Sequence, residues 1–190
     1  MTLVRASAFL LFFVAACSAA ASATTKTFEI SEPAFSVALP APCRHEMGPG
    51  TLEAVCAADL DAEKSKDVQA AGAILLEVDF EITPPDSKPY SEAEFRQELP
   101  ESVCGEGDTK KVRLEAVKEI AAADQTTFSA LVVCPELKFL GLGERHAEAL
   151  TVITPRSRFR LMARYPTEDV DMAKPLAKAF FQSFKFKSAP

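Results

Sequence analysis

Residues 73–82 read AILLEVDFEI, and this stretch decides the class of fold. Apolar side chains occupy every second position from Ile74 to Ile82, and carboxylates occupy three of the four positions between them. Alternation with a period of two is typical of a β-strand with one face in the core and the other mostly in water. A proline pair at 84–85 ends the strand, because proline cannot donate a hydrogen bond to a sheet.

Further strands are predicted on both sides of this stretch. On the N-terminal side, residues 35–39 alternate apolar with small side chains, and a short strand at 27–30 can precede them. Residues 51–57 are expected to form the hairpin partner of 35–39. On the C-terminal side, four strand-like stretches follow in close succession, which implies antiparallel hairpins. They span 111–121, 126–134, 146–154 and 157–165.

One helix is predicted between the strands. Ser91 is a suitable N-cap, and Glu94 three residues later completes a capping-box pattern. We expect this helix to run through about Leu99 and to stop at Pro100.

A second helix is predicted at 170–183, where apolar side chains recur at helical spacing. Pro175 is expected in its first turn, so that regular helix begins near Ala173. Successive strands with one helix inserted and one at the end predict a single α+β domain over residues 26–190. In this domain the helices pack on an antiparallel sheet.

The first residues have the pattern of an export signal. Arg5 supplies a positive charge, residues 6–16 form an apolar run, and small residues at 21–23 suit a signal peptidase. The run is shorter than the roughly 20 residues that a transmembrane helix needs. Residues 1–23 are therefore predicted to be a signal peptide, and the mature protein is expected in the periplasm or outside the cell.

Cys17 opens a second interpretation of the same segment. Val14-Ala15-Ala16-Cys17 fits a bacterial lipobox, which would leave a signal of residues 1–16, an acylated Cys17 and a flexible tether through residue 25. The two interpretations stay open. A lipid on Cys17 would be the chain's contact with a membrane.

Charge excludes some classes of partner. Removal of residues 1–23 leaves 20 basic and 27 acidic residues, a net charge of -7. This balance disfavours nucleic acid and anionic membrane surfaces as partners.

Cysteine usage agrees with an oxidising compartment. Without Cys17, four of the five cysteines remain, and an even number in an exported chain is typical of disulfides. Three pairings are possible. Cys43 with Cys56 and Cys104 with Cys134 is favoured, because the first pair flanks a predicted turn at 48–50.

Three stretches resemble the PsbP/DcrB-like family. They are FSVALP at 35–40, the long strand at 72–82 and AKAFFQSFK at 177–185, and the resemblance extends over about 35–186. It implies an α/β/α sandwich around an antiparallel sheet. The family includes bacterial lipoproteins and extrinsic subunits of photosynthetic complexes, so the resemblance implies a binding or assembly role. It assigns no functional residue to this chain.

Two clusters are candidates for chemistry. Glu144, His146 and Glu148 alternate along a predicted strand and could converge on a metal ion, or they could be the solvated start of that strand. The second cluster is a row of arginines that could bind an anion, or could pair across strands with Glu77, Asp79 and Glu81. These arginines are Arg158, Arg160 and Arg164.

The sequence therefore favours an exported, non-enzymatic binding or accessory protein without a cofactor, whose partner is an unidentified protein or small molecule. One alternative is a metal- or ligand-binding enzyme that uses His146 with Glu144 and Glu148. Another is an assembly factor for an envelope or membrane complex.

Overall fold

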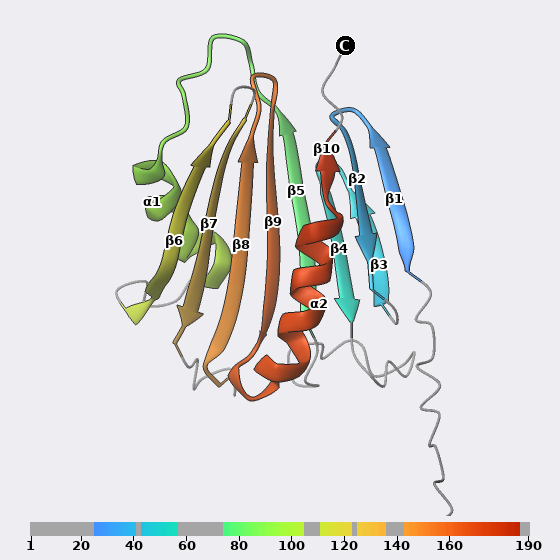
Figure 1. The fold of residues 1–190 in the computed structure, drawn as a ribbon, viewed down its shortest axis with the longest axis vertical. Coiled ribbons are helices and arrows are strands. Elements are labelled where there is room, and N and C mark those ends of the chain that lie inside the picture. Colours follow the sequence, from blue (N-terminus) through green and yellow to red (C-terminus); the bar gives the residue numbers. More distant parts are fainter. Residues whose placement is uncertain are drawn as a thin grey trace, which may run out of the picture.

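The structure is a computed structural model, and it describes residues 25–40, 43–56, 74–104, 111–122, 125–135 and 143–186. These residues form antiparallel sheets with helices packed on them, which confirms the predicted α+β class (Figure 1). The strands are β1 (Lys26–Ser31), β2 (Ala34–Leu39), β3 (Cys43–Gly48), β4 (Thr51–Cys56), β5 (Ile74–Ile82), β6 (Arg113–Ala121), β7 (Thr126–Cys134), β8 (Arg145–Ile153), β9 (Ser157–Pro166) and β10 (Lys185–Phe186). The helices are α1 (Glu92–Cys104) and α2 (Val170–Ser183), and a 3-10 turn at Thr167–Asp169 leads into α2.

The large sheet has the order β3-β4-β5-β9-β8-β7-β6. Its centre is the long pair β5 and β9, in which Val78 lies opposite Leu161. Both strands show the predicted alternation. Ile74, Leu76 and Val78 are buried on one face, while the carboxylates of β5 lie on the other.

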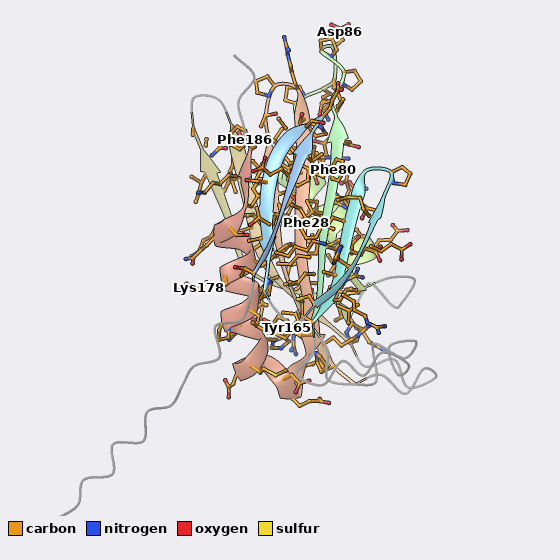
Figure 2. All side chains as sticks on the ribbon, turned by 90° about the vertical axis from the view of Figure 1, so that its right-hand side faces the viewer. Phe28, Phe80, Asp86, Tyr165, Lys178 and Phe186 are labelled. Atoms are coloured by element: carbon orange, nitrogen blue, oxygen red, sulfur yellow. A yellow bond between two sulfur atoms is a disulfide. The ribbon has the colours of Figure 1, made fainter. Side chains whose placement is uncertain are left out.

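Each face of the large sheet carries its own core. α2 and the small sheet β1-β2-β10 cover one face, where Phe35, Leu76, Leu161 and Phe180 are buried together. Phe28, Phe80 and Phe186, labelled in Figure 2, pack against the same core. α1 covers the other face over β6, β7 and β8 through a second cluster of buried residues. α2 lies in front of the sheet and α1 behind it in Figure 1, so the α/β/α sandwich is confirmed.

The start of α1 follows the predicted capping box. The Ser91 N–H donates to Glu94 Oε2 at 2.8 Å, and the Glu94 N–H donates to Ser91 Oγ at 3.3 Å. The predicted stop at Pro100 is wrong, because α1 continues to Cys104. Proline removes the hydrogen bond to the carbonyl of Arg96, but Arg96 is exposed and water can replace that bond. Burial of Val103 and Cys104 then stabilises the last turn.

The second helix, α2, spans the predicted residues 170–183, but the expectation that regular helix begins near Ala173 is wrong. The helix begins at Val170, so Pro175 lies in its interior rather than in its first turn. The carbonyl that loses its partner belongs to Asp171, which is exposed to water. Ala173, Ala177 and Phe180 are fully buried against the sheet, and this burial keeps the helix continuous through the proline.

The N-terminal hairpins differ from the prediction. Strand β2 pairs with β1 and β10, whereas β4 pairs with β3 around the turn at Pro49 and Gly50. Strand β3 was missed because it is an edge strand whose central residues are all exposed, so it shows no alternation. His45 lies in β3, where its ring packs on Phe28.

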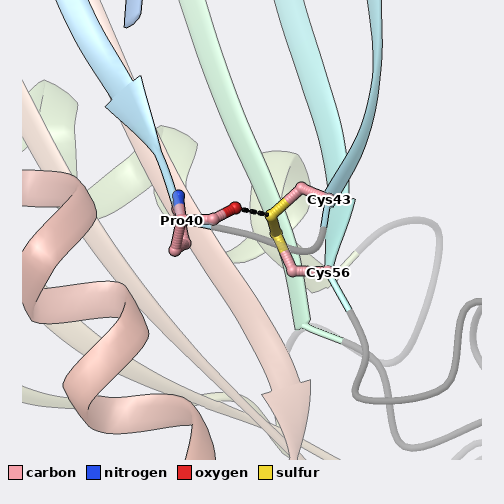
Figure 3. The surroundings of a disulfide bond; sticks show 3 residues. All are labelled: Pro40, Cys43 and Cys56. Carbon is pink, nitrogen blue, oxygen red and sulfur yellow. Dashed lines mark hydrogen bonds between the residues drawn. A yellow bond between two sulfur atoms is a disulfide. The ribbon is translucent and has the colours of Figure 1, made fainter. Parts of the chain in front are cut away.

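Disulfides join both pairs of cysteines that the sequence favoured. Cys43 and Cys56 are opposite one another in β3 and β4, with Cα atoms 4.1 Å apart, and the Pro40 carbonyl lies against Cys43 Sγ (Figure 3). Cys104 at the end of α1 is joined to Cys134 at the end of β7, with a Cα–Cα distance of 5.4 Å. The second bond links the helix to the sheet beneath it.

The predicted signal at 1–23 and the lipobox with Cys17 lie outside the described residues. Within the described ranges, no helix is long and apolar enough to cross a membrane.

Candidate functional site

The predicted arginine row lies on the α1 side of β9, and carboxylates neutralise it. Arg158 Nε is 2.6 Å from Glu81 Oε1, and Arg160 Nη2 is 2.9 Å from Glu98 Oε2 of α1. Arg164 pairs with Glu77 of β5. Glu77 and Glu81 therefore act as cross-strand partners, whereas Arg160 takes its partner from the helix instead of from Asp79. This arrangement favours the interpretation as ion pairs over an anion site formed by these three arginines.

Tyr90 adds a further link between this arginine row and α1. Its hydroxyl donates to Glu98 Oε2 at 3.0 Å, and the Arg158 guanidinium lies 5.0 Å from the centre of its ring. Burial, together with the Glu98 charge, raises the pKa of Tyr90 to about 12. The cluster is thus internally paired and holds α1 on the sheet.

The predicted metal cluster is not assembled. Glu148 accepts a 2.7 Å hydrogen bond from the buried Tyr165 hydroxyl, and Glu144 lies 3.4 Å from Arg113. The His146 ring packs edge-on against Tyr165, with 6.0 Å between the ring centres. No three ligand-type side chains of the described residues are grouped to hold a metal ion. The enzyme alternative therefore loses the arrangement on which it depended.

A different site lies on the opposite face of the large sheet. α2 packs over β2, β5, β8 and β9, and among the described elements none lies in front of β6 and β7 (Figure 1). A half-open groove of about 470 Å³ remains between α2 and strands β6, β7 and β8. We call it the α2 groove. Its lining residues are Ala116, Lys118, Ser129, Ala130, Leu131, Glu148, Ala149, Leu150, Lys174, Lys178, Phe181 and Gln182.

The surface of the α2 groove is mainly apolar. Leu131 of β7 and Leu150 of β8 are partly exposed, and Phe181 of α2 stands beside them. A partner that covers these side chains would gain roughly 25 cal/mol for each Å² of apolar area removed from water. The groove is therefore a surface on which an apolar group can be buried.

Three lysines give the α2 groove a positive charge. Lys118 comes from β6, while Lys174 and Lys178 are one helical turn apart on α2. Lys178 lies on the outer side of α2, and Tyr165 lies near the lower end of the same helix (Figure 2). None of these lysines has an ion-pair partner among the described residues, and Glu148 is the one carboxylate in the lining. On a chain of net charge -6, this positive surface is a local exception.

A β-bulge places Lys118 in the groove. In β6 the pairing with β7 shifts between Glu115 and Lys118, and Ala116 has a positive φ of 50°. The extra residue reverses the alternation, so that Lys118 lies opposite Ser129 on the α2 side and Val117 packs toward α1. Without the bulge, Lys118 would point to the α1 side.

This site was not predicted from the sequence. The spacing of Lys174 and Lys178 beside Phe181 was a usable signal, since residues four apart share one side of a helix. Lys118 offered no such signal, because an uninterrupted strand would have placed it on the other face.

Comparison with known proteins gives the fold. No family model matches the chain, and no curated protein matches it in sequence. The solution structure of a cyanobacterial PsbP (CyanoP) from Synechocystis is similar, with a TM-score of 0.61 and 12% identity. The match covers 92% of this chain and 99% of that one. The Ran-binding protein Mog1p of Saccharomyces cerevisiae has a TM-score of 0.54 and 15% identity, over 87% of this chain and 96% of that one.

These two solved structures share the architecture of the chain but little of its sequence. The chain has the PsbP-like fold that the sequence resemblance implied, and that expectation is confirmed. A fold shared at this identity assigns no site, so function has to be argued from the residues of this chain.

Proposed function

We propose that the protein is an exported, non-enzymatic binding domain that recognises an anionic partner through the α2 groove. The observation that carries this proposal is the set of unpaired lysines, Lys118, Lys174 and Lys178, around an apolar surface that no described element covers. Apolar burial would supply affinity, and the lysines would select and orient a negatively charged partner. The volume of about 470 Å³ suits a few side chains of a partner protein or one small ligand.

Two observations support binding rather than catalysis. Among the titratable groups that the sequence offered for chemistry, Glu148 is engaged with Tyr165, Glu144 with Arg113, and the arginine row with carboxylates. In addition, a protein of the same fold, Mog1p, is described as Ran-binding, so this architecture can present a surface to a protein.

Export is supported by the signal pattern at 1–23 and by the two disulfides, which persist in oxidising compartments. Cleavage at the lipobox would anchor the domain to a membrane through Cys17, and a partner in an envelope complex would then make it an assembly factor.

The intact mass of the mature protein from its native host distinguishes the lipid-anchored form from the freely soluble form. A start at Cys17 with acyl mass identifies a lipoprotein, and a start at Thr24 identifies a freely soluble protein.

The proposed function is tested by charge reversal in the α2 groove. The test variant is K118E/K174E/K178E, and the control K26E/R156E/K185E changes the net charge equally at exposed basic residues outside the groove. A partner is first isolated on the immobilised wild-type chain from a native envelope extract and then titrated in purified form against all three proteins.

We expect the groove variant to weaken the affinity about tenfold or more, because three attractive contacts become repulsive. The control should bind like the wild type. Equal affinity of the two variants would show that the partner binds elsewhere, and the proposal would be wrong.

A further inference from the structure

Two arginines lie side by side at one end of β8 and β9, on the α1 side of the sheet. Arg145 is opposite Pro166, and Arg164 is opposite Ala147, so the two side chains are diagonal neighbours on one face. Arg145 is also opposite Cys134, whose disulfide to Cys104 holds the end of α1 over this position. The pair is therefore partly covered by the helix and its disulfide.

Three N–H donors of this pair have no hydrogen-bond partner among the described residues. Nε and Nη2 of Arg145 and Nε of Arg164 are buried, and no described residue accepts from them. The Nε–H and Nη2–H of one guanidinium point in the same direction and form the fork that binds two oxygens of a carboxylate or phosphate. Arg145 thus presents a complete fork to which no described residue bonds, while Nη2 of Arg164 is engaged with Glu77.

Like charges lie close together at this position. Arg145 and Arg164 are neighbours, Glu77 is the carboxylate that pairs with Arg164, and burial together with the Arg164 charge lowers the pKa of Arg145. Burial also raises the pKa of Glu77. Neighbouring like charges and buried N–H groups without an acceptor are both unfavourable, and a bound anion would reduce both penalties at once.

We propose that Arg145 and Arg164 form a binding site for a small oxyanion, a carboxylate or a phosphate. Arg145 binds two of its oxygens through Nε and Nη2, and Arg164 Nε donates to the same group. This site shares no residue with the α2 groove and lies on the opposite face of the sheet, so it stands apart from the proposed function. It also differs from the predicted arginine row, because Arg158 and Arg160 are neutralised and Arg145 lies on another strand.

The site is tested by adding anions to the protein in an anion-poor buffer. Inorganic phosphate and succinate are titrated separately, and the Nε–H resonances of Arg145 and Arg164 are followed by NMR together with the melting temperature. We expect at least one anion to shift both resonances and to raise the melting temperature, since a ligand that binds only the folded state stabilises it. A response to phosphate alone would identify a phosphate site. A response to succinate would identify a site for the carboxylate of a partner.

Variants distinguish an anion-binding site from two arginines that only contribute to the stability of the fold. R145K should weaken anion binding about tenfold or more, because lysine has no fork. R145M should melt at a higher temperature than the wild type without anion and should lose the response to anion. Arg156→Gln, which changes an exposed arginine, should behave like the wild type. The proposal is wrong if neither anion shifts the two resonances, or if R145M is destabilised and keeps the anion response.

Discussion

At the scale of single residues, both tyrosines of the chain use their hydroxyls in the same way. Tyr90 donates to Glu98 on α1, and Tyr165 donates to Glu148 of β8. Burial and the neighbouring carboxylate stabilise the neutral phenol, so the pKa of each tyrosine is raised above its usual 10.0. Each carboxylate thereby accepts a hydrogen bond from a tyrosine hydroxyl within the fold.

An alkaline titration of phenolate absorbance checks this arrangement. The native protein should show no ionisation at the usual pH of 10.0, and Tyr90 should ionise near a pKa of about 12. Because the folded pKa lies above the unfolded one, the stabilisation is complete below pH 10.0 and is lost as the pH rises toward about 12. Y90F assigns the transition. A full tyrosine equivalent that ionises at pH 10.0 in the native protein would contradict the structure.

At the scale of elements, α1 depends on its N-terminal contacts. The Ser91 hydroxyl and Lys88 both bind the Glu94 carboxylate, and Glu92 pairs with Arg96 one turn later at 2.6 Å. Hydrogen bonds from Ser91, followed by the one from Lys88, lower the pKa of Glu94 to about 2. The ionised carboxylate is therefore part of the folded helix end.

Acid should weaken this end of the helix. Since the folded pKa of Glu94 is lowered, its contribution is present above the unfolded value of 4.5 and is lost as the pH falls toward about 2. Glu94→Gln should make the loss of stability between these pH values shallower than in the wild type, as measured by urea unfolding at each pH. Glu101→Gln, at an exposed position of the same helix, is the control. A Glu94→Gln profile parallel to the wild type would refute the capping role.

At the scale of the whole molecule, the two disulfides stabilise separate parts. Cys43–Cys56 joins the edge hairpin β3 and β4, whereas Cys104–Cys134 joins α1 to the opposite half of the sheet. The second bond closes the longer loop, with a sequence separation of 30 against 13. Its Cys134 lies opposite Arg145, so this disulfide also borders the proposed oxyanion site.

Removal of the second disulfide should loosen one layer of the sandwich. In C104A/C134A we expect the free energy of unfolding to fall by about 3–4 kcal/mol in the chain-entropy model. Amide hydrogen exchange should accelerate at Phe95 and Leu99 in α1 more than at Val78 in β5. C43A/C56A is the matched comparison and should lose about 3 kcal/mol, with faster exchange in β3 and β4. Uniform acceleration in both variants would mean that α1 has no separate dependence on its disulfide.

The sequence alone determined the features that rest on local pattern. The alternation at 73–82 and 157–165 predicted the central strands and their buried faces, because a period of two leaves a single way to bury apolar side chains. The capping box at Ser91 and Glu94 predicted the start of α1, since its hydrogen bonds join neighbours in the chain. The PsbP-like ending at 177–185 indicated the architecture.

Tertiary structure decided what depends on distant contacts. Edge strand β3 exists through its pairing with β4, and both helices continue past a proline because buried side chains on the sheet stabilise the turns beyond it. The bulge at Ala116 moves Lys118 into the α2 groove, and strand register brings Arg145 beside Arg164. The sequence cannot show these placements, because one inserted residue or one step of register sends a side chain to the opposite face of a sheet.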